Sequence, residues 1–336
     1  MDILDKILRR NSAQLMNLPN VVGVGKGWKM TRGETTRDMS IVVLVRKKIP
    51  SQELHRSEKV PKTLGQANTD VLEVGEIRLL GRTDYQRPAP PGVSIGHYQI
   101  SAGTFGAVVR DRNSEELLIL SNNHVLANST DGRDGRSKKG DLIFQPGPHD
   151  GGTKEHLIGY LDRFIPLSRE YGASTCPQAS SLEHWSNLLL QRIRPNYRVV
   201  LQRQNAQGNL VDAAVARPVS QNAITPEILE VGNVKGVKEA QIGAKLKKSG
   251  RSSGLNTSEV RVVSALMRVA LSTQESVMFD DQIVTGPMAS PGDSGSLVLD
   301  EDNYAIGLLF AGSDSASVVN RIQHVMEMLE IDPVVT

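Results

Sequence analysis

Apolar side chains at a helical spacing open the chain. Polar residues separate Ile3, Leu4, Ile7, Leu8 and Leu15. Such a pattern places the apolar side chains on one face and predicts an amphipathic helix over residues 2–17. We expect this helix to pack on its own domain rather than to anchor in a membrane.

β-branched runs follow the helix. VVGVGKGWKM (21–30) and MSIVVLVRKK (39–48) are separated by a charged turn, which predicts a hairpin. DVLEVGEIRLL (70–80) predicts a further strand. One helix and several strands within residues 1–80 indicate a small α+β domain.

Prolines mark the next segment. Residues 81–100 contain Pro88, Pro90 and Pro91. Because proline cannot donate to a β-ladder and stiffens the chain, the pattern predicts a linker over residues 81–97.

Short β runs at regular spacing fill the rest of the chain. Gly- or Pro-marked turns separate them, which is typical of an all-β barrel or sandwich. Two stretches break the rhythm: a polar, Gly-rich loop at 128–141 and an insertion at 166–196 that contains the helical pattern SSLEHWSNLLLQRI. Apolar positions near the end predict a closing helix: Val318, Ile322, Val325, Met326 and Leu329. We therefore expect a mainly β domain over residues 98–336.

Composition narrows the class of protein. Hydrophobic residues make up 39% and charged residues 23% of the 336 residues, as in ordinary globular proteins, and the net charge is +2. A dedicated nucleic-acid binder would carry a concentrated basic face, so no nucleic-acid partner is expected. Neither a signal peptide nor a membrane-spanning run is apparent, and a single cysteine, Cys176, excludes an intramolecular disulfide. These features favour a cytoplasmic protein without a membrane partner.

The stretch PGDSGSLVLD (291–300) raises the question of a nucleophile. A Gly-Asp-Ser-Gly turn is weak by itself, because tight loops recruit these residues anyway. Ser294 also needs an imidazole to take its proton. Of seven histidines, His124 stands out because it directly follows an apolar strand in LLILSNNHVLANS.

A carboxylate must orient that imidazole. Asp212 in NLVDAAVARP follows an apolar pair and precedes small apolar residues. Burying a carboxylate there is costly unless the carboxylate is paired. An ordinary turn aspartate remains the alternative when this segment is considered alone.

Together, these segments resemble the trypsin-like (chymotrypsin-fold) serine peptidases. ILSNNHVL is similar to that family's His segment, VDAAVARP to its Asp segment, and SPGDSGSLVLD to its nucleophile loop. The chain order His124, Asp212, Ser294 is also the family's order. The resemblance covers about residues 98–332 and implies a double β-barrel, so the expected fold is mainly β, with the small α+β domain in front.

The resemblance also implies roles for individual residues. Ser294 would be the nucleophile, His124 the general base and then acid, and Asp212 the orienting group. The backbone N–H groups of Gly292 and Ser294 would form the oxyanion hole. By alignment Met288 falls at the floor of the substrate pocket, where trypsins carry an aspartate; a small or apolar substrate side chain is therefore expected.

Two strand residues complete the implied substrate site. Ala311 and Gly312 would offer an open strand edge to the substrate backbone, and the alternative is that they are simply core strand residues. Asp293 is expected to be satisfied by backbone donors or a nearby basic residue, because the sequence shows no activation site before the barrel.

The N-terminal residues are less informative about chemistry. They resemble a leader domain of some bacterial trypsin-like proteins. Lys26, Lys29, Arg46, Lys47 and Lys48 could form a patch for an acidic partner, but a solvated hairpin face is the favoured interpretation.

The sequence predicts a serine endopeptidase that acts on protein or peptide substrates. The alternative is a latent or inactive binding protein that a protein activator or self-association regulates, since fold alone does not establish activity. The histidines are scattered and the cysteine is alone, so neither a metal nor a cofactor is expected.

Overall fold

The computed structural model describes residues 2–31, 34–75, 81–100, 102–173, 176–204, 208–271 and 275–335. The chain divides into two compact units, Met1–Leu80 and Gly81–Thr336. Each unit is described by itself below.

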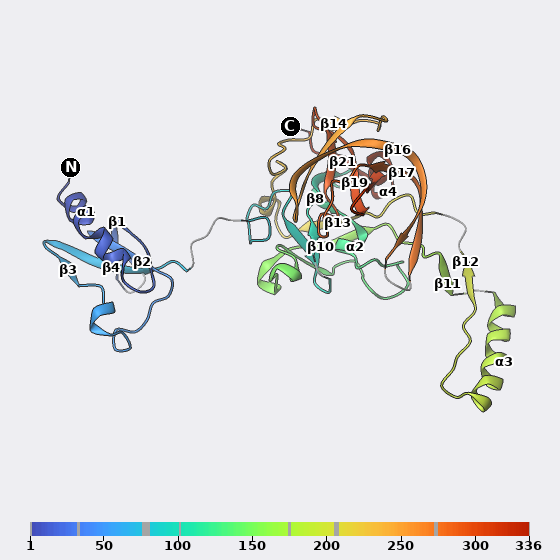
Figure 1. Ribbon diagram of the computed structural model, residues 1–336, viewed down its shortest axis with the longest axis horizontal. Coiled ribbons are helices and arrows are strands. Elements are labelled where there is room, and N and C mark those ends of the chain that lie inside the picture. Colours follow the sequence, from blue (N-terminus) through green and yellow to red (C-terminus); the bar gives the residue numbers. More distant parts are fainter. Residues whose placement is uncertain are drawn as a thin grey trace. The chain divides into compact units, whose positions relative to one another are not determined.

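The first unit is a helix packed on a four-stranded sheet (Figure 1). Its elements are α1 (Ile3–Met16), β1 (Val21–Thr31), β2 (Glu34–Val45), the 3₁₀ turn η1 (Arg56–Glu58), β3 (Thr63–Leu64) and β4 (Ala67–Glu73), with the strand order β1-β2-β4-β3. Ile41, Val43 and Val45 alternate along β2 and are buried beside Leu15 of α1. The predicted helix and hairpin are confirmed.

Pairing of β4 departs from a simple meander. β4 runs parallel to β2, with Val71 opposite Val43. The strand predicted over residues 70–80 ends at Glu73, and its positions 76–80 lie outside the described residues.

An eight-stranded sheet forms one half of the second unit. Its order is β21-β7-β8-β13-β10-β9-β5-β6. The strands are β5 (Ser94–His97), β6 (Gly103–Thr104), β7 (Ala107–Asp111), β8 (Leu117–Ser121), β9 (Leu142–Phe144), β10 (Leu157–Phe164), β13 (Ala214–Pro218) and β21 (Ile331–Pro333). Phe105, Ile119 and Ile143 lie in the core that this sheet curls around.

A seven-stranded sheet forms the other half. Its order is β14-β19-β18-β15-β16-β17-β20, and a further pairing of β19 with β20 closes six of the strands into a barrel. The strands are β14 (Gly236–Val237), β15 (Lys245–Gly250), β16 (Gly254–Ala270), β17 (Ser276–Thr285), β18 (Leu297–Asp300), β19 (Tyr304–Gly312) and β20 (Ser317–Arg321). Within these six strands every strand has a neighbour on both sides, which limits the unpaired edges that promote aggregation.

A third core joins the two sheets. Leu118 and Leu120 of β8 pack with Leu297 and Leu308 of the seven-stranded sheet. Val325 of α4 (Ile322–Leu329) belongs to the same core. The predicted fold class is confirmed: the chain is mainly β with curled sheets, and a small α+β unit precedes them in the sequence.

The remaining elements are short or lie in the insertion. They are α2 (Asn123–Leu126), η2 (Pro148–Asp150), η3 (Lys154–His156), β11 (Tyr171–Ala173), α3 (Pro177–Ile193), β12 (Gln202–Gln204) and η4 (Gln221–Ala223). β11 pairs with β12, and α3 occupies the predicted helical insertion.

The segment predicted as a linker is instead part of the second unit. Ala89, Val93 and Ile95 are fully buried, and Ser94 begins strand β5 of the eight-stranded sheet. The Ala89 N–H donates to the Ala223 carbonyl at 2.8 Å. Prolines remove donors only at their own positions, so the residues between and after them still pair and pack.

We predict that Ile95→Ala destabilises the second unit by about 2–5 kcal/mol, because it leaves a cavity in a close-packed core. Chemical denaturation would measure the loss. Val219→Ala, which changes an exposed side chain of the same unit, should change the free energy of unfolding by less than about 0.5 kcal/mol. Equal effects of the two substitutions would contradict the packing described here.

Candidate active site

His124 lies in a one-turn helix, α2, directly after strand β8. Its Nδ1 lies 2.5 Å from Oδ2 of Asp212, and its backbone N–H donates to Oδ1 of the same carboxylate at 3.1 Å. Asp212 precedes β13, which pairs with β8, so the antiparallel ladder brings the two residues together. Two bonds from one residue to one carboxylate fix the orientation of the ring.

The carboxylate alters the titration of the imidazole. Burial opposes the charged form of His124, but the charge of Asp212 and its hydrogen bond prevail and raise the pKa of His124 above its ordinary value. A carboxylate on Nδ1 holds the ring so that Nε2 is available to accept a proton.

The seven-stranded sheet of the second unit holds Asp212 in place. The Asp212 N–H donates to Oδ1 of Asn320 at 3.0 Å, and Nδ2 of Asn320 donates to Oε1 of Gln282 at 2.7 Å. Asn320 and Gln282 are fully buried, on β20 and β17. The position of the carboxylate therefore depends on residues from both halves of the unit.

Ser294 lies in the loop between β17 and β18. Its Oγ donates to the Phe310 carbonyl at 3.4 Å, so in this conformation the hydroxyl is directed to β19 and not to the imidazole. Free enzymes commonly show long or misaligned catalytic hydrogen bonds that tighten only with substrate.

The loop that carries Ser294 packs closely against the strand that leads to His124. Gly295 has φ +93°, and a Cβ at this position would lie 2.1 Å from Oγ of Ser121 and 2.5 Å from the Thr104 carbonyl oxygen. Only glycine permits both this φ and this approach. Ser121 is the last residue of β8, so the loop and the His124 segment meet there.

Gly292 also adopts a conformation that favours glycine, with φ +97°. The Thr104 hydroxyl donates to the Gly292 carbonyl at 2.9 Å and accepts the Arg251 N–H at 3.0 Å, which fixes the direction of the carbonyl. Within the described parts of the chain, no protein group accepts a hydrogen bond from the N–H of Gly292 or of Ser294. Both donors are free to bind an anionic oxygen.

The buried side chain of Asp293 fixes the loop that carries Ser294. Its Oδ2 lies 2.7 Å from Nζ of Lys248, and both side chains are fully buried. Oδ1 accepts the N–H groups of Ser252 and Ser253, and Oδ2 accepts the Ser290 N–H and the Ser253 hydroxyl. The expectation that a basic residue and backbone donors satisfy Asp293 is confirmed.

Electrostatics favour the ionised form of Asp293. Burial by itself would raise its pKa, but the hydrogen bonds from Lys248 and Ser253 and the ammonium charge lower the pKa below its ordinary value.

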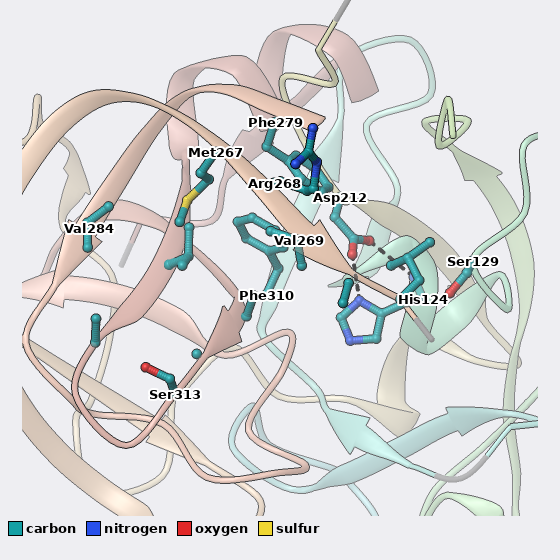
Figure 2. A pocket seen from close by; sticks show the side chains of 16 residues that line it. His124, Ser129, Asp212, Met267, Arg268, Val269, Phe279, Val284, Phe310 and Ser313 are labelled. Atoms are coloured by element: carbon teal, nitrogen blue, oxygen red, sulfur yellow. Dashed lines mark hydrogen bonds and ion pairs between the residues drawn. The ribbon is translucent and has the colours of Figure 1, made fainter. Parts of the chain in front are cut away.

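Two adjoining cavities lie beside these residues. One, of about 570 Å³, is lined by His124, Asp212 and an apolar wall that includes Met267, Val269 and Phe310. Figure 2 shows the His124 ring joined to the Asp212 carboxylate, together with the side chains of Met267, Val269 and Phe310 that line the same cavity. A smaller cavity, of about 280 Å³, is lined by Ser294 and Leu309. Ala311, Gly312 and Ser313 line both cavities.

Of the three residues predicted to line the substrate pocket, two line the cavities and one does not. Ala311 and Gly312, the predicted strand edge, line both cavities. Met288 is buried in the core of the second sheet, its N–H donates to Oγ of Ser317, and it does not line either cavity. Asp314, which sequence analysis did not single out, lines the smaller cavity and is exposed.

Sequence analysis missed the supporting residues because they lie far from the motifs. Lys248, Thr104 and Asn320 belong to separate strands, β15, β6 and β20. Residues 245–250, KLKKSG, contain three lysines, so nothing in the sequence distinguished the buried Lys248 from its two neighbours.

No group of three or more His, Cys, Asp or Glu side chains among the described residues could hold a metal ion. Over the same residues, every helix is too short or too polar to cross a membrane.

Comparisons with known proteins give structural matches alone. No protein-family model matches the sequence, and no curated protein matches it. The solved structures that resemble the chain include Thermobifida fusca Protease A, at 14% identity and a TM-score of 0.47, covering 74% of this chain and all of the protease. Another is Cellulomonas bogoriensis chymotrypsin, at 14% identity and a TM-score of 0.44; the match covers 73% of this chain and 98% of the chymotrypsin chain.

A third similar structure is a Nocardiopsis protease, at 14% identity and a TM-score of 0.46, covering 73% of this chain and 99% of the protease. All three TM-scores are below 0.5.

We predict that Lys248→Met destabilises the protein by about 3–5 kcal/mol, because it leaves the Asp293 charge buried without a partner. Urea denaturation would measure the loss. The double variant with Asp293→Asn should be more stable than Lys248→Met alone.

Lys245→Met, which changes an exposed lysine of the same strand, is the matched control and should have an effect below about 0.5 kcal/mol. If Lys248→Met is no more destabilising than this control, the buried ion pair does not hold the loop.

Proposed function

We propose that residues 81–336 form a serine hydrolase that cleaves peptide bonds through an acyl-enzyme. The observation that carries the proposal is the contact of 2.5 Å between Nδ1 of His124 and Oδ2 of Asp212 at the wall of a cavity that adjoins the Ser294 loop. A buried carboxylate on Nδ1 is the arrangement that makes Nε2 an effective base.

The proposed reaction requires one rotation of the Ser294 side chain. Oγ leaves the Phe310 carbonyl and donates to Nε2 of His124, which takes the proton as Oγ attacks the substrate carbonyl carbon. The resulting imidazolium is stabilised by Asp212 and gives its proton to the leaving amine. Water then hydrolyses the acyl-enzyme with His124 acting again as base.

The free N–H groups of Gly292 and Ser294 support an oxyanion hole. Each such donor contributes about 2.7–4 kcal/mol to transition-state stabilisation. Thr104 and the Lys248–Asp293 pair hold the loop in the required conformation before substrate arrives, so little reorganisation is needed at the moment of reaction.

The cavities support substrates with apolar side chains on the acyl side of the cleaved bond. Met267, Val269 and Phe310 form an apolar wall beside His124, and burying apolar surface there is favourable. The edge of β19 at Ala311 and Gly312 lies between the two cavities and is the proposed site of pairing with the substrate backbone.

The second candidate is a latent form of the same enzyme. The hydrogen bond from Ser294 Oγ to the Phe310 carbonyl favours it, because this hydroxyl is held away from the base. In a latent form a protein activator or self-association would release the hydroxyl.

Labelling with a fluorophosphonate probe tests the active enzyme. We expect the full chain to be labelled, because the probe reports an activated serine, and we expect Ser294→Ala and His124→Ala to abolish the signal. Ser181→Ala, which removes an exposed hydroxyl on α3, should retain it. A folded chain that stays unlabelled would refute constitutive activity and leave the latent form, for which labelling must appear on adding the activator.

The pH dependence of kcat/KM gives a second prediction. His124 must be neutral to accept the proton, and its pKa is raised, so activity should fall as the pH drops through a value above the ordinary imidazole pKa of about 6.5. Hydrolysis of an ester substrate with apolar side chains would measure the profile.

Asp212→Asn removes the charge that raises this pKa and permits the wrong tautomer, so kcat should fall by a factor on the order of 10⁴. An acid limb that stays at the same pH in this variant would show that His124 is not the titrating group.

A further inference from the structure

The first unit contains a cavity that the proposed hydrolase does not use. It has a volume of about 670 Å³ and is lined by residues between Pro19 and Val71. Small-molecule sites in proteins have volumes of about 300–1,000 Å³. The cavity continues the core face of the sheet, because Val21, Val45, Val60 and Val71 also belong to the cluster that packs under α1.

The walls of this cavity are aliphatic. The apolar part of the lining includes six branched aliphatic residues: Val21, Val45, Ile49, Leu54, Val60 and Val71. Pro19 and Pro50 add further apolar surface, and the lining contains no aromatic side chain. Walls of this kind favour a flexible aliphatic ligand, because a flat ring would find no stacking partner.

Two polar side chains in the lining already form hydrogen bonds within the protein. Asn20 bonds to the backbone of Lys47 in both directions, its Nδ2 donating to the carbonyl at 2.6 Å and its Oδ1 accepting the N–H at 3.1 Å. Oε2 of Glu58 accepts the His55 N–H at 2.8 Å. A bound peptide would need partners along its backbone, whereas an aliphatic chain needs none.

Four lysines surround the aliphatic walls. Lys47, Lys48, Lys59 and Lys62 line the cavity, and all four are exposed. None of them takes part in an ion pair with another of the described residues. Their positive charge is therefore available to a ligand, and charge-assisted bonds from lysine to a carboxylate are among the stronger hydrogen bonds.

We propose that this cavity binds a long-chain aliphatic carboxylate of the fatty-acid class. The hydrocarbon chain lies among the six aliphatic side chains, and the carboxylate lies at the lysines. One polar end on an otherwise apolar ligand matches the division of the lining into charged and aliphatic parts.

Fluorescence titration with cis-parinaric acid, a naturally fluorescent fatty acid, tests the site on the full chain. We expect saturable binding that oleate displaces and that oleyl alcohol, which lacks the carboxylate, displaces about tenfold to a hundredfold less well. Ser294→Ala should bind equally, so failure of the hydrolase proposal would not affect this result.

Two variants locate the site. Replacing Lys47, Lys48, Lys59 and Lys62 by Gln should weaken the binding of parinaric acid by about tenfold or more. A matched control that replaces Lys6, Arg9, Arg10 and Arg37 by Gln removes the same number of charges from exposed positions of the same unit and should leave binding unchanged. Ile49→Asp, at a side chain 39% exposed, should weaken the binding of both oleate and oleyl alcohol.

Three outcomes would overturn the proposal. The first is an absence of saturable binding to the full chain. The second is an equal loss of binding in the lysine variant and its matched control, which would indicate non-specific attraction to positive charge. The third is displacement by oleyl alcohol as effective as that by oleate.

Discussion

The buried ion pair between Lys248 and Asp293 is the interaction on which the candidate site depends. The two groups lie 2.7 Å apart without exposure to solvent, where an unpaired charge would be very costly. Asp293 lies between Gly292 and Ser294, so its fixed position determines where their backbone N–H groups point. Because Lys248 belongs to β15 of the closed barrel, the barrel supports the loop directly and the ion pair requires no free chain terminus.

Local patterns predicted much of the fold and the central residues of the site. The strands of both sheets have the alternating or apolar runs expected of buried β-structure, and His124 and Asp212 each stand where such a run begins or ends. The ladder between β8 and β13 brings these ends together. An adjacent-strand relation of this kind is implied once the strands and their order are known.

Long-range constraints could not be predicted in the same way. Thr104 bonds to Gly292, 188 positions away, and Asn320 bonds to Asp212, 108 positions away, and no sequence period encodes such a pairing. The linker prediction failed for a related reason: prolines suggested an extended, unpacked chain, whereas the burial of Ala89 and Val93 depends on partners elsewhere. The aliphatic cavity of the first unit likewise arises from residues spread between 19 and 71.

The bond from Asn320 to the Asp212 amide links the site to the last part of the chain. Asn320 lies near the end of β20, two residues before α4, whose Ile322 and Val325 lie in the core between the eight-stranded and seven-stranded sheets. Opening of β20 and α4 would release the Asp212 amide and free the carboxylate to turn away from the imidazole. Proton exchange at the Asp212 amide should therefore require the opening event that separates β20 and α4 from the rest of the unit, so that the proposed active site and this part of the fold form one cooperative unit.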